Sequence, residues 1–267
     1  MPIRYDKKIR QEQKHEEALT QWRLKYERLS KEHSHLQSVV QSLMHESRRF
    51  SAEIAANADE LSRFANGSGN GRISELADTI FYTVGLLSSR MTFSDYELNP
   101  QSMHRQTLIR TGIYKKFDKS RHILAKQAKE KTLTIKFDGN STMEIDAHKS
   151  FELVPFVLLD NAIKYSPPNQ HITVVFDEIK NKNLNVTMRS CGPRISPEEH
   201  TRLFSRGMRG TLAEKSGIQG EGLGLFLAKT LCHMNNIVIN SDKPAPSTFS
   251  MNGIEYSDFV VHLEVRR

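Results

Sequence analysis

The chain has 267 residues, of which 37% are hydrophobic and 26% are charged, and its formal net charge is +7. This length is sufficient for two domains with a sizeable core, and the composition excludes a disordered or fibrous protein. No apolar stretch approaches the roughly 20 residues that a membrane-spanning helix needs, and the charged N-terminus lacks the apolar segment of a secretory signal. Two cysteines, Cys191 and Cys232, are too few for a disulfide framework or a four-cysteine zinc site. We therefore predict a cytoplasmic protein.

The long N-terminal segment shows the periodicity of a paired helix. From Trp22 to Phe64, apolar or semi-apolar residues recur at alternating steps of four and three, which predicts a coiled-coil helix. Residues 66–71 contain three glycines and two asparagines and should end this helix. A second periodic seam then runs from Ile73 to Met91. The predicted seam residues of the first helix are Trp22, Tyr26, Leu29, His33, Leu36, Val40, Leu43, Ser47, Phe50, Ile54, Asn57, Leu61 and Phe64.

Two such helices joined by a short loop predict an antiparallel hairpin. One hairpin cannot bury both apolar seams, so we expect a homodimer in which two hairpins form a four-helix bundle. We assign residues 1–100 to this coiled-coil and dimerisation region and residues 101–267 to a second domain.

The pattern changes after Pro100 to short strands and helices. The sequence predicts helices at about 108–130 and from Ser150 to Tyr165, where Pro167 and Pro168 prevent continuation, and another opened by Ser196 and Pro197. These elements predict a two-layer α+β sandwich with helices on one face of a mixed sheet. Strands are expected at 133–137, 143–145, 171–176, 184–188, 237–240 and 259–265.

The net positive charge comes from one part of this second domain. Residues 101–131 hold nine lysines and arginines against two acidic residues, a difference of 9 − 2 = 7 that equals the whole net charge. A basic helix can attract phosphates or an acidic partner protein, or it can be a solvated face. The segment lacks an interleaved aromatic platform for stacking on bases, so we expect no nucleic-acid partner.

Three short motifs follow one another in the second domain. Asn161 and Lys164 share one face of a predicted helix, where an amide oxygen could hold Mg²⁺ and an ammonium group could meet phosphates. Residues 189–195 form a strand end with a glycine-containing loop. Gly220, Gly222 and Gly224 precede a helix, where backbone N–H groups can approach a polyphosphate at the positive helix end.

Together these motifs resemble the catalytic domain of two-component sensor histidine kinases, over about residues 105–265. Residues 161–166 resemble the N box, 192–195 the G1 box, 220–224 the G2 box and 203–210 the F box that begins the ATP lid. The resemblance implies ATP and Mg²⁺ as cofactors, with Asn161 as the magnesium ligand, Lys164 and Tyr165 on phosphate and base, and Arg206 and Arg209 on the phosphates. The predicted ATP-binding residues are Asn161, Lys164, Tyr165, Ser190, Gly192, Ile195, Arg206, Arg209, Gly220, Gly222, Leu223 and Gly224.

Three positions depart from the family pattern. Ser190 stands where the family usually has the aspartate that accepts the adenine amino hydrogen, and Val157 replaces a frequent asparagine four residues before Asn161. Arg194 replaces the second glycine of the G1 box. A serine hydroxyl can still accept the base hydrogen bond, although without charge assistance.

A phosphoacceptor is expected on the first helix. In the heptad frame of Leu43 and Phe50, His45 falls at an outward-facing position, and its neutral imidazole nitrogen could attack phosphorus while Glu46 takes or orients the other ring proton. His45, Glu46 and Arg48 resemble the family's H box. Arg49 occupies the position of a residue that commonly aligns water for phosphatase action.

We therefore predict a soluble sensor histidine kinase that phosphorylates His45 from ATP and passes the phosphoryl group to an aspartate of a response-regulator receiver domain. One alternative is a catalytically impaired, nucleotide-binding pseudokinase or interaction module of the same fold. Another is an ATP-gated clamp that contacts nucleic acid through the basic segment.

Overall fold

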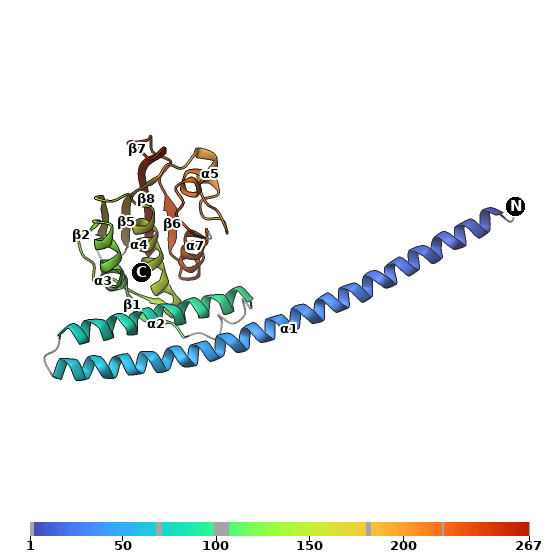
Figure 1. The fold of residues 1–267 in the computed structure, drawn as a ribbon, viewed down its shortest axis with the longest axis horizontal. Coiled ribbons are helices and arrows are strands. Elements are labelled where there is room, and N and C mark those ends of the chain that lie inside the picture. The colour runs from blue at the N-terminus through green and yellow to red at the C-terminus, as the bar shows by residue number, and fades with distance from the viewer. Residues whose placement is uncertain (1–2, 68–70, 99–106, 180–182, 221, 267) are drawn as a thin grey trace.

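The structure is a computed structural model that describes residues 3–67, 71–98, 107–179, 183–220 and 222–266. Helices α1 (Ile3–Gly67) and α2 (Gly71–Leu98) form an antiparallel hairpin, and α2 lies between α1 and the α/β part of the chain (Figure 1). The N-terminal half of α1 extends well beyond the hairpin (Figure 1). The predicted glycine break agrees with these ends, although residues 68–70 and the expected domain boundary at 100/101 lie outside the described residues.

Small side chains form the contact between the two helices of the hairpin. Ser62 Oγ donates to Asp78 Oδ1 at 3.0 Å and lies 3.1 Å from Ser74 Oγ, which fixes the register of α1 against α2. Large residues of the predicted seam lie outside this contact: Phe64 is 74% exposed and Leu61 is 43% exposed. A narrow stripe of alanine and serine therefore brings the helices close together, and the larger apolar residues remain on the outside. The buried residues of the hairpin include Ser51, Ala58, Ser62, Ala65, Ser74, Ala77 and Val84.

The α/β part opens with a strand where the sequence predicted a helix. Strand β1 (Ile109–Gly112) pairs antiparallel with β3 (Glu144–Ala147), and only then does α3 (Ile113–Glu130) begin. The extended conformation is stabilised across the ladder, because Arg110 contacts Glu144 at 3.4 Å and Asp146 at 3.7 Å. These partners lie more than thirty residues away in sequence, so helical periodicity alone could not reveal the strand.

The main sheet has the strand order β2-β4-β5-β8-β6. Strands β2 and β4 are parallel and the other pairs are antiparallel, so the sheet is mixed, as predicted. Strands β5 and β8 are longer than expected, and the short elements α6 and β7 were not predicted. The elements after β1, α3 and β3 are β2 (Thr134–Asp138), η2 (Lys149–Glu152), α4 (Leu153–Tyr165), β4 (His171–Ile179), β5 (Asn183–Pro193), α5 (Pro197–Thr201), α6 (Thr211–Lys215), α7 (Gly224–Met234), β6 (Val238–Ser241), β7 (Phe249–Met251) and β8 (Ile254–Arg266).

One face of this sheet is buried against helices α3, α4 and α7. Alternate residues of β4, such as Ile172 and Val174, are fully buried. Leu158 and Leu159 of α4 are at most 1% exposed. Alternation along the strands and the apolar character of α4 produce this core, because strand side chains point to opposite faces in turn. The result is the two-layer arrangement that the sequence predicts.

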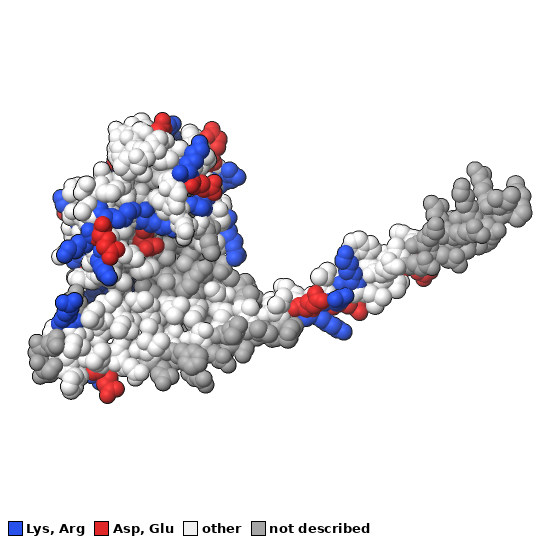
Figure 2. All heavy atoms as spheres, viewed as in Figure 1, with Lys and Arg blue, Asp and Glu red and all other residues white. Residues whose placement is uncertain are grey.

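Several residues of the basic segment have acidic partners within the domain. Lys116 contacts Glu152 at 3.1 Å with both side chains largely buried, and Lys115 lies 3.8 Å from Glu144. Arg121 contacts Asp118 at 2.5 Å. Figure 2 shows lysines and arginines on the α/β part with acidic side chains among them. Part of the positive charge of residues 101–131 therefore forms ion pairs within the domain. Within the described ranges, no helix has the length and apolar character needed to span a membrane.

Candidate functional site

The predicted motifs converge on one large cavity of about 1540 Å³. It is bounded by α4, the end of β5, the segment from Leu203 to Gly224 and the start of α7, and it extends to α3 and to one face of α2. Ten of the twelve predicted ATP-binding residues line it, so residues as far apart in sequence as Asn161 and Gly224 meet in a single site. They are Asn161, Lys164, Tyr165, Ser190, Ile195, Arg209, Gly220, Gly222, Leu223 and Gly224.

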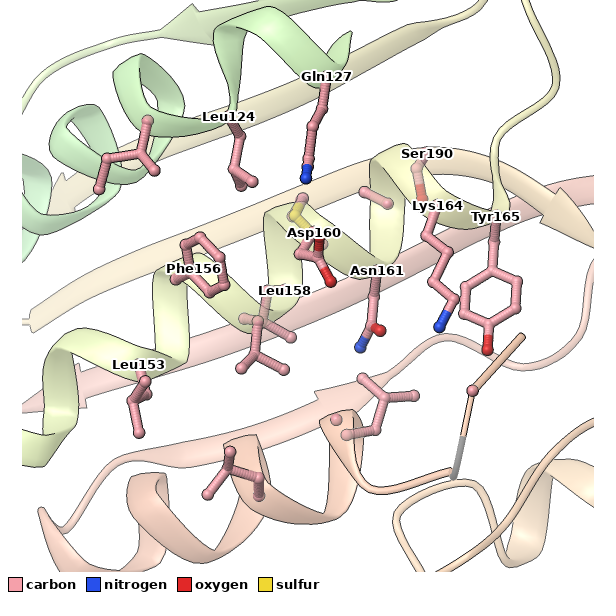
Figure 3. A pocket seen from close by; sticks show the side chains of 18 of the residues that line it. Leu124, Gln127, Leu153, Phe156, Leu158, Asp160, Asn161, Lys164, Tyr165 and Ser190 are labelled. Atoms are coloured by element: carbon pink, nitrogen blue, oxygen red, sulfur yellow. The ribbon is translucent and has the colours of Figure 1, made fainter. Parts of the chain in front are cut away.

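Helix α4 supplies the polar wall of the cavity. Figure 3 shows Asp160, Asn161, Lys164 and Tyr165 projecting from α4 toward α7 and the loop before it. The Lys164 ammonium lies 5.5 Å from the centre of the Tyr165 ring. Burial raises the pKa of Asp160, and the positive charge of Lys164 opposes that rise. This wall therefore offers a carboxylate, an amide and a cation side by side.

The other end of the cavity is enclosed by strand β5. Ser190 is 4% exposed and lines the cavity together with Met188 of the same strand. Ser166 Oγ at the end of α4 donates to Cys191 O at 2.8 Å, which joins the two motifs directly. Burial and the nearby Asp258 raise the pKa of the Cys191 thiol to about 11, so this thiol stays protonated at neutral pH.

Glycine is required where the loop before α7 meets α4 and the lid. A Cβ atom at Gly224 would lie 2.7 Å from Asn161 Nδ2 and 3.2 Å from Val157 Cγ1. Gly222 has a φ of +68°, and a Cβ there would lie 2.5 Å from the backbone of Gly207. Gly207 N donates to Gly222 O at 3.1 Å, and this hydrogen bond joins the start of the lid to the loop before α7. Only glycine permits these approaches without strain.

The lid places one of its two predicted arginines at the cavity. Arg209 lines it, donates from Nη2 to Ile218 O at 2.5 Å, and has a buried Nε without a partner in the described part of the chain. Arg206 instead lies over the Phe226 ring at 5.9 Å and is not among the cavity residues. Gly192 is also outside the lining; it lies in β5 beneath Tyr165, where a Cβ would be 3.9 Å from Tyr165 Cβ.

The cavity also contains residues that the sequence motifs did not identify. Asp160 could have been found, because it is four residues before Lys164 and shares its face of the helix. Gln127 of α3 points toward α4 in Figure 3. Residues of α2, among them Leu76 and Thr79, reach the cavity only through the packing of the hairpin against the domain, which no local motif encodes.

The predicted phosphoacceptor lies in a different element. His45 and Glu46 are within α1, and their side chains fall outside the described ones. Their predicted roles therefore stay predictions.

Comparison with known proteins finds similarity in the C-terminal part of the chain. Residues 147–264 match the family described as "Histidine kinase-, DNA gyrase B-, and HSP90-like ATPase". "Swarming motility regulation sensor protein RssA" of Serratia marcescens is 32% identical over 105 residues, which cover 39% of this chain and 22% of that protein. "Sensor protein SrrB" of Staphylococcus aureus is 32% identical over 94 residues, which cover 34% of this chain and 16% of that protein.

Among solved structures, the "Mycobacterial sensor histidine kinase MprB" is 18% identical with a TM-score of 0.46, covering 60% of this chain and 97% of that one. The matched region spans less than a quarter of the length of the two curated relatives, RssA and SrrB. The match of residues 147–264 to this ATPase family model and the two curated relatives confirm the resemblance to two-component sensor histidine kinases.

Proposed function

We propose that the chain is a sensor histidine kinase that transfers the γ-phosphoryl group of ATP to His45 and then to an aspartate of a separate response-regulator receiver domain. The observation that carries this proposal is the convergence of the N-box, G1 and G2 residues on one cavity. The buried, unpaired Arg209 Nε on the same cavity supports an anionic ligand, because a buried charged donor without a partner is costly.

The residues at the cavity are suited to magnesium as well as to ATP. Asn161 directs a side-chain amide toward Gly224 in a space that a Cβ would fill. Mg²⁺ is commonly held by one or two protein oxygens, with phosphate oxygens and waters completing its shell. We infer that Asn161 Oδ1 is the protein ligand. When bound, the ion neutralises charge on the phosphates.

The remaining steps are performed by side chains of the chain itself. Lys164 and Arg209 orient the phosphates, and Ser190 accepts the adenine amino hydrogen. A neutral ring nitrogen of His45 bonds to the γ-phosphorus, the bond from that phosphorus to the β–γ bridging oxygen breaks, and ADP leaves. The proton on the other ring nitrogen goes to the Glu46 carboxylate, directly or through water.

We also propose that the active form is a homodimer built through the helical hairpin. Large apolar side chains on the outside of α1 and α2 support this, among them Ile54 at 48%, Phe64 at 74% and Ile80 at 43% exposure. Figure 2 shows few charged side chains on the described face of the hairpin. A second hairpin would cover such a surface. The cytoplasmic location stays a prediction from cysteine usage.

The test is incubation of the purified chain with γ-labelled ATP and Mg²⁺, beside His45→Ala and Asn161→Ala. We expect acid-labile, alkali-stable label that is lost in both variants, followed by transfer to a receiver domain. Label that persists in His45→Ala would assign the phosphoacceptor elsewhere. Nucleotide binding without any label would contradict the kinase and favour the pseudokinase alternative, which the comparisons do not favour.

A further inference from the structure

The C-terminal end of α4 has an unusual requirement for hydrogen-bond donors. The last carbonyls of a helix lack intrahelical partners unless the following residues supply N–H groups. Here the next residues after Ser166 are Pro167 and Pro168, which have no N–H. The carbonyls of Ile163 and Lys164 are the ones that residues 167 and 168 would have satisfied in a continued helix.

Lys131 supplies these missing donors. Its ammonium group donates to Ile163 O at 2.8 Å, Lys164 O at 2.8 Å and Ser166 O at 2.9 Å, so all three of its N–H bonds have backbone acceptors. A cation at this position also interacts favourably with the negative end of the helix dipole. The lysine therefore replaces the two N–H groups that the prolines lack.

The turn that carries Lys131 is fastened to the turn that follows α4. Asn169 N donates to Lys131 O at 3.3 Å, and Thr132 Oγ1 donates to Asn169 Oδ1 at 2.7 Å. Thr132 and Asn169 both have positive φ values, 55° and 63°, which these bonds help to maintain. The backbone of Lys131 is therefore bonded to the turn after α4, and its side chain is bonded to the end of α4.

The same helical turn carries two side chains of the candidate nucleotide site. Lys164 and Tyr165 line the cavity. The next residue, Ser166, donates a hydrogen bond from Oγ to Cys191 O, which is adjacent to Ser190 in sequence. We propose that Lys131 is a positioning residue of the nucleotide site: by replacing the donors that Pro167 and Pro168 lack, it sets where Lys164 stands. This inference rests on the proposed ATP-binding function.

The test compares Lys131→Met with Lys131→Arg and Lys131→Gln, both of which keep N–H donors, and with Lys136→Met, a matched removal of an exposed lysine on β2. ATP and adenosine are titrated calorimetrically at a temperature where circular dichroism shows each variant to be folded. Adenosine is included because it lacks the phosphates that Lys164 would meet.

We expect Lys131→Met to bind ATP on the order of tenfold more weakly than the wild type, with a clearly smaller loss for adenosine. Lys131→Arg and Lys131→Gln should recover part of the ATP affinity, and Lys136→Met should bind like the wild type. If Lys131→Met does not fold, Lys131→Gln replaces it in the test: a larger loss of affinity for ATP than for adenosine supports the positioning role, and equal losses contradict it.

Equal losses for ATP and adenosine, or unchanged ATP binding in Lys131→Met, would overturn the positioning role and leave the proposed function standing. A wild-type chain that binds adenosine but not ATP, or neither, would refute the proposed function itself.

Discussion

At the scale of single residues, the contact between Gly224 and Asn161 determines whether the site can form. A methyl group at Gly224 would lie within 3.2 Å of both Asn161 and Val157, so Gly224→Ala must displace the proposed magnesium ligand. We expect ATP affinity in the presence of Mg²⁺ to fall at least about tenfold, a loss of about 1.4 kcal/mol. Calorimetric titration measures this. Gly71→Ala, where an added carbon meets nothing within 4 Å, is the control and should bind normally.

Ser190 offers a test of base recognition by gain of affinity. An aspartate at this buried position would accept the adenine amino hydrogen with charge assistance, which should strengthen ATP binding by about 1–2 kcal/mol. Without ATP, the unpaired carboxylate should lower the melting temperature of Ser190→Asp, because burying a charge without a partner is costly. GTP, which has a carbonyl at the corresponding position, is the control ligand. An equal gain for GTP would refute this role of Ser190.

That ten of the predicted residues share one cavity was foreseeable from the sequence, because their motifs are short and contiguous. Asn161 and Lys164 share a helix face, and Gly220, Gly222 and Gly224 lie within five residues of sequence. The contribution of Lys131 was not predictable, since its acceptors are 32 to 35 residues away and become neighbours only when α3 packs beside α4. Locally, Lys131 is one more cation of the basic segment.

At the scale of elements, the lid helix α6 is anchored by a small second core. Leu212 of α6 packs against a buried cluster of Cys191, Ile254 and Tyr256 that the β7–β8 hairpin completes. Leu212→Ala should release α6 and speed tryptic cleavage after Arg209 and after Lys215 severalfold, while the main core keeps the melting temperature nearly unchanged. Leu19→Ala, which truncates an exposed leucine of α1, is the control. Unchanged cleavage would show that the lid is held in another way.

A carboxylate connects α5 with the lid helix α6 and makes their contact pH-dependent. Glu199 accepts from Ser196 N at 2.9 Å and from Thr211 N at 2.7 Å. Burial would raise the pKa of Glu199, but the hydrogen bonds from Ser196 and Thr211 outweigh it and hold the pKa below its ordinary value of 4.5.

Because the folded-state pKa is depressed, the stabilisation by Glu199 is present above pH 4.5 and is lost as the pH falls through that lower pKa. We expect Glu199→Gln to have a lower melting temperature than the wild type at pH 6, with the difference shrinking below about pH 4. Melting curves over this range measure it. A difference that stays constant with pH would contradict the assignment.

Short elements were the part of the fold that the sequence could not reveal. Strand β7 has three residues and α6 has five, so each is too short to repeat its apolar pattern, and both depend on contacts such as that of Leu212. Helix α4 and strand β4 were predicted closely because burial imposes a long and regular apolar pattern on them.

At the scale of the whole molecule, the outer face of the hairpin predicts self-association. Leu61 is 43% exposed although it belongs to the predicted heptad seam. Leu61→Glu should shift the chain from dimer to monomer in sedimentation experiments, because it would place charge in an apolar interface. The wild-type melting temperature should also fall on dilution. Glu60→Ala, on an exposed neighbour, should stay dimeric, and a monomeric wild type at micromolar concentration would refute the dimer.

Helix α2 belongs to two structures at once, since it packs against α1 and also forms part of the wall around the cavity. If the proposed ATP binds in this cavity, a rotation of α2 that alters the wall would change the free energy of ATP binding. Thermodynamic linkage requires the reverse as well: ATP must favour the orientation of α2 that binds it more tightly, by the same factor. The orientation of the hairpin and the concentration of ATP would then be coupled.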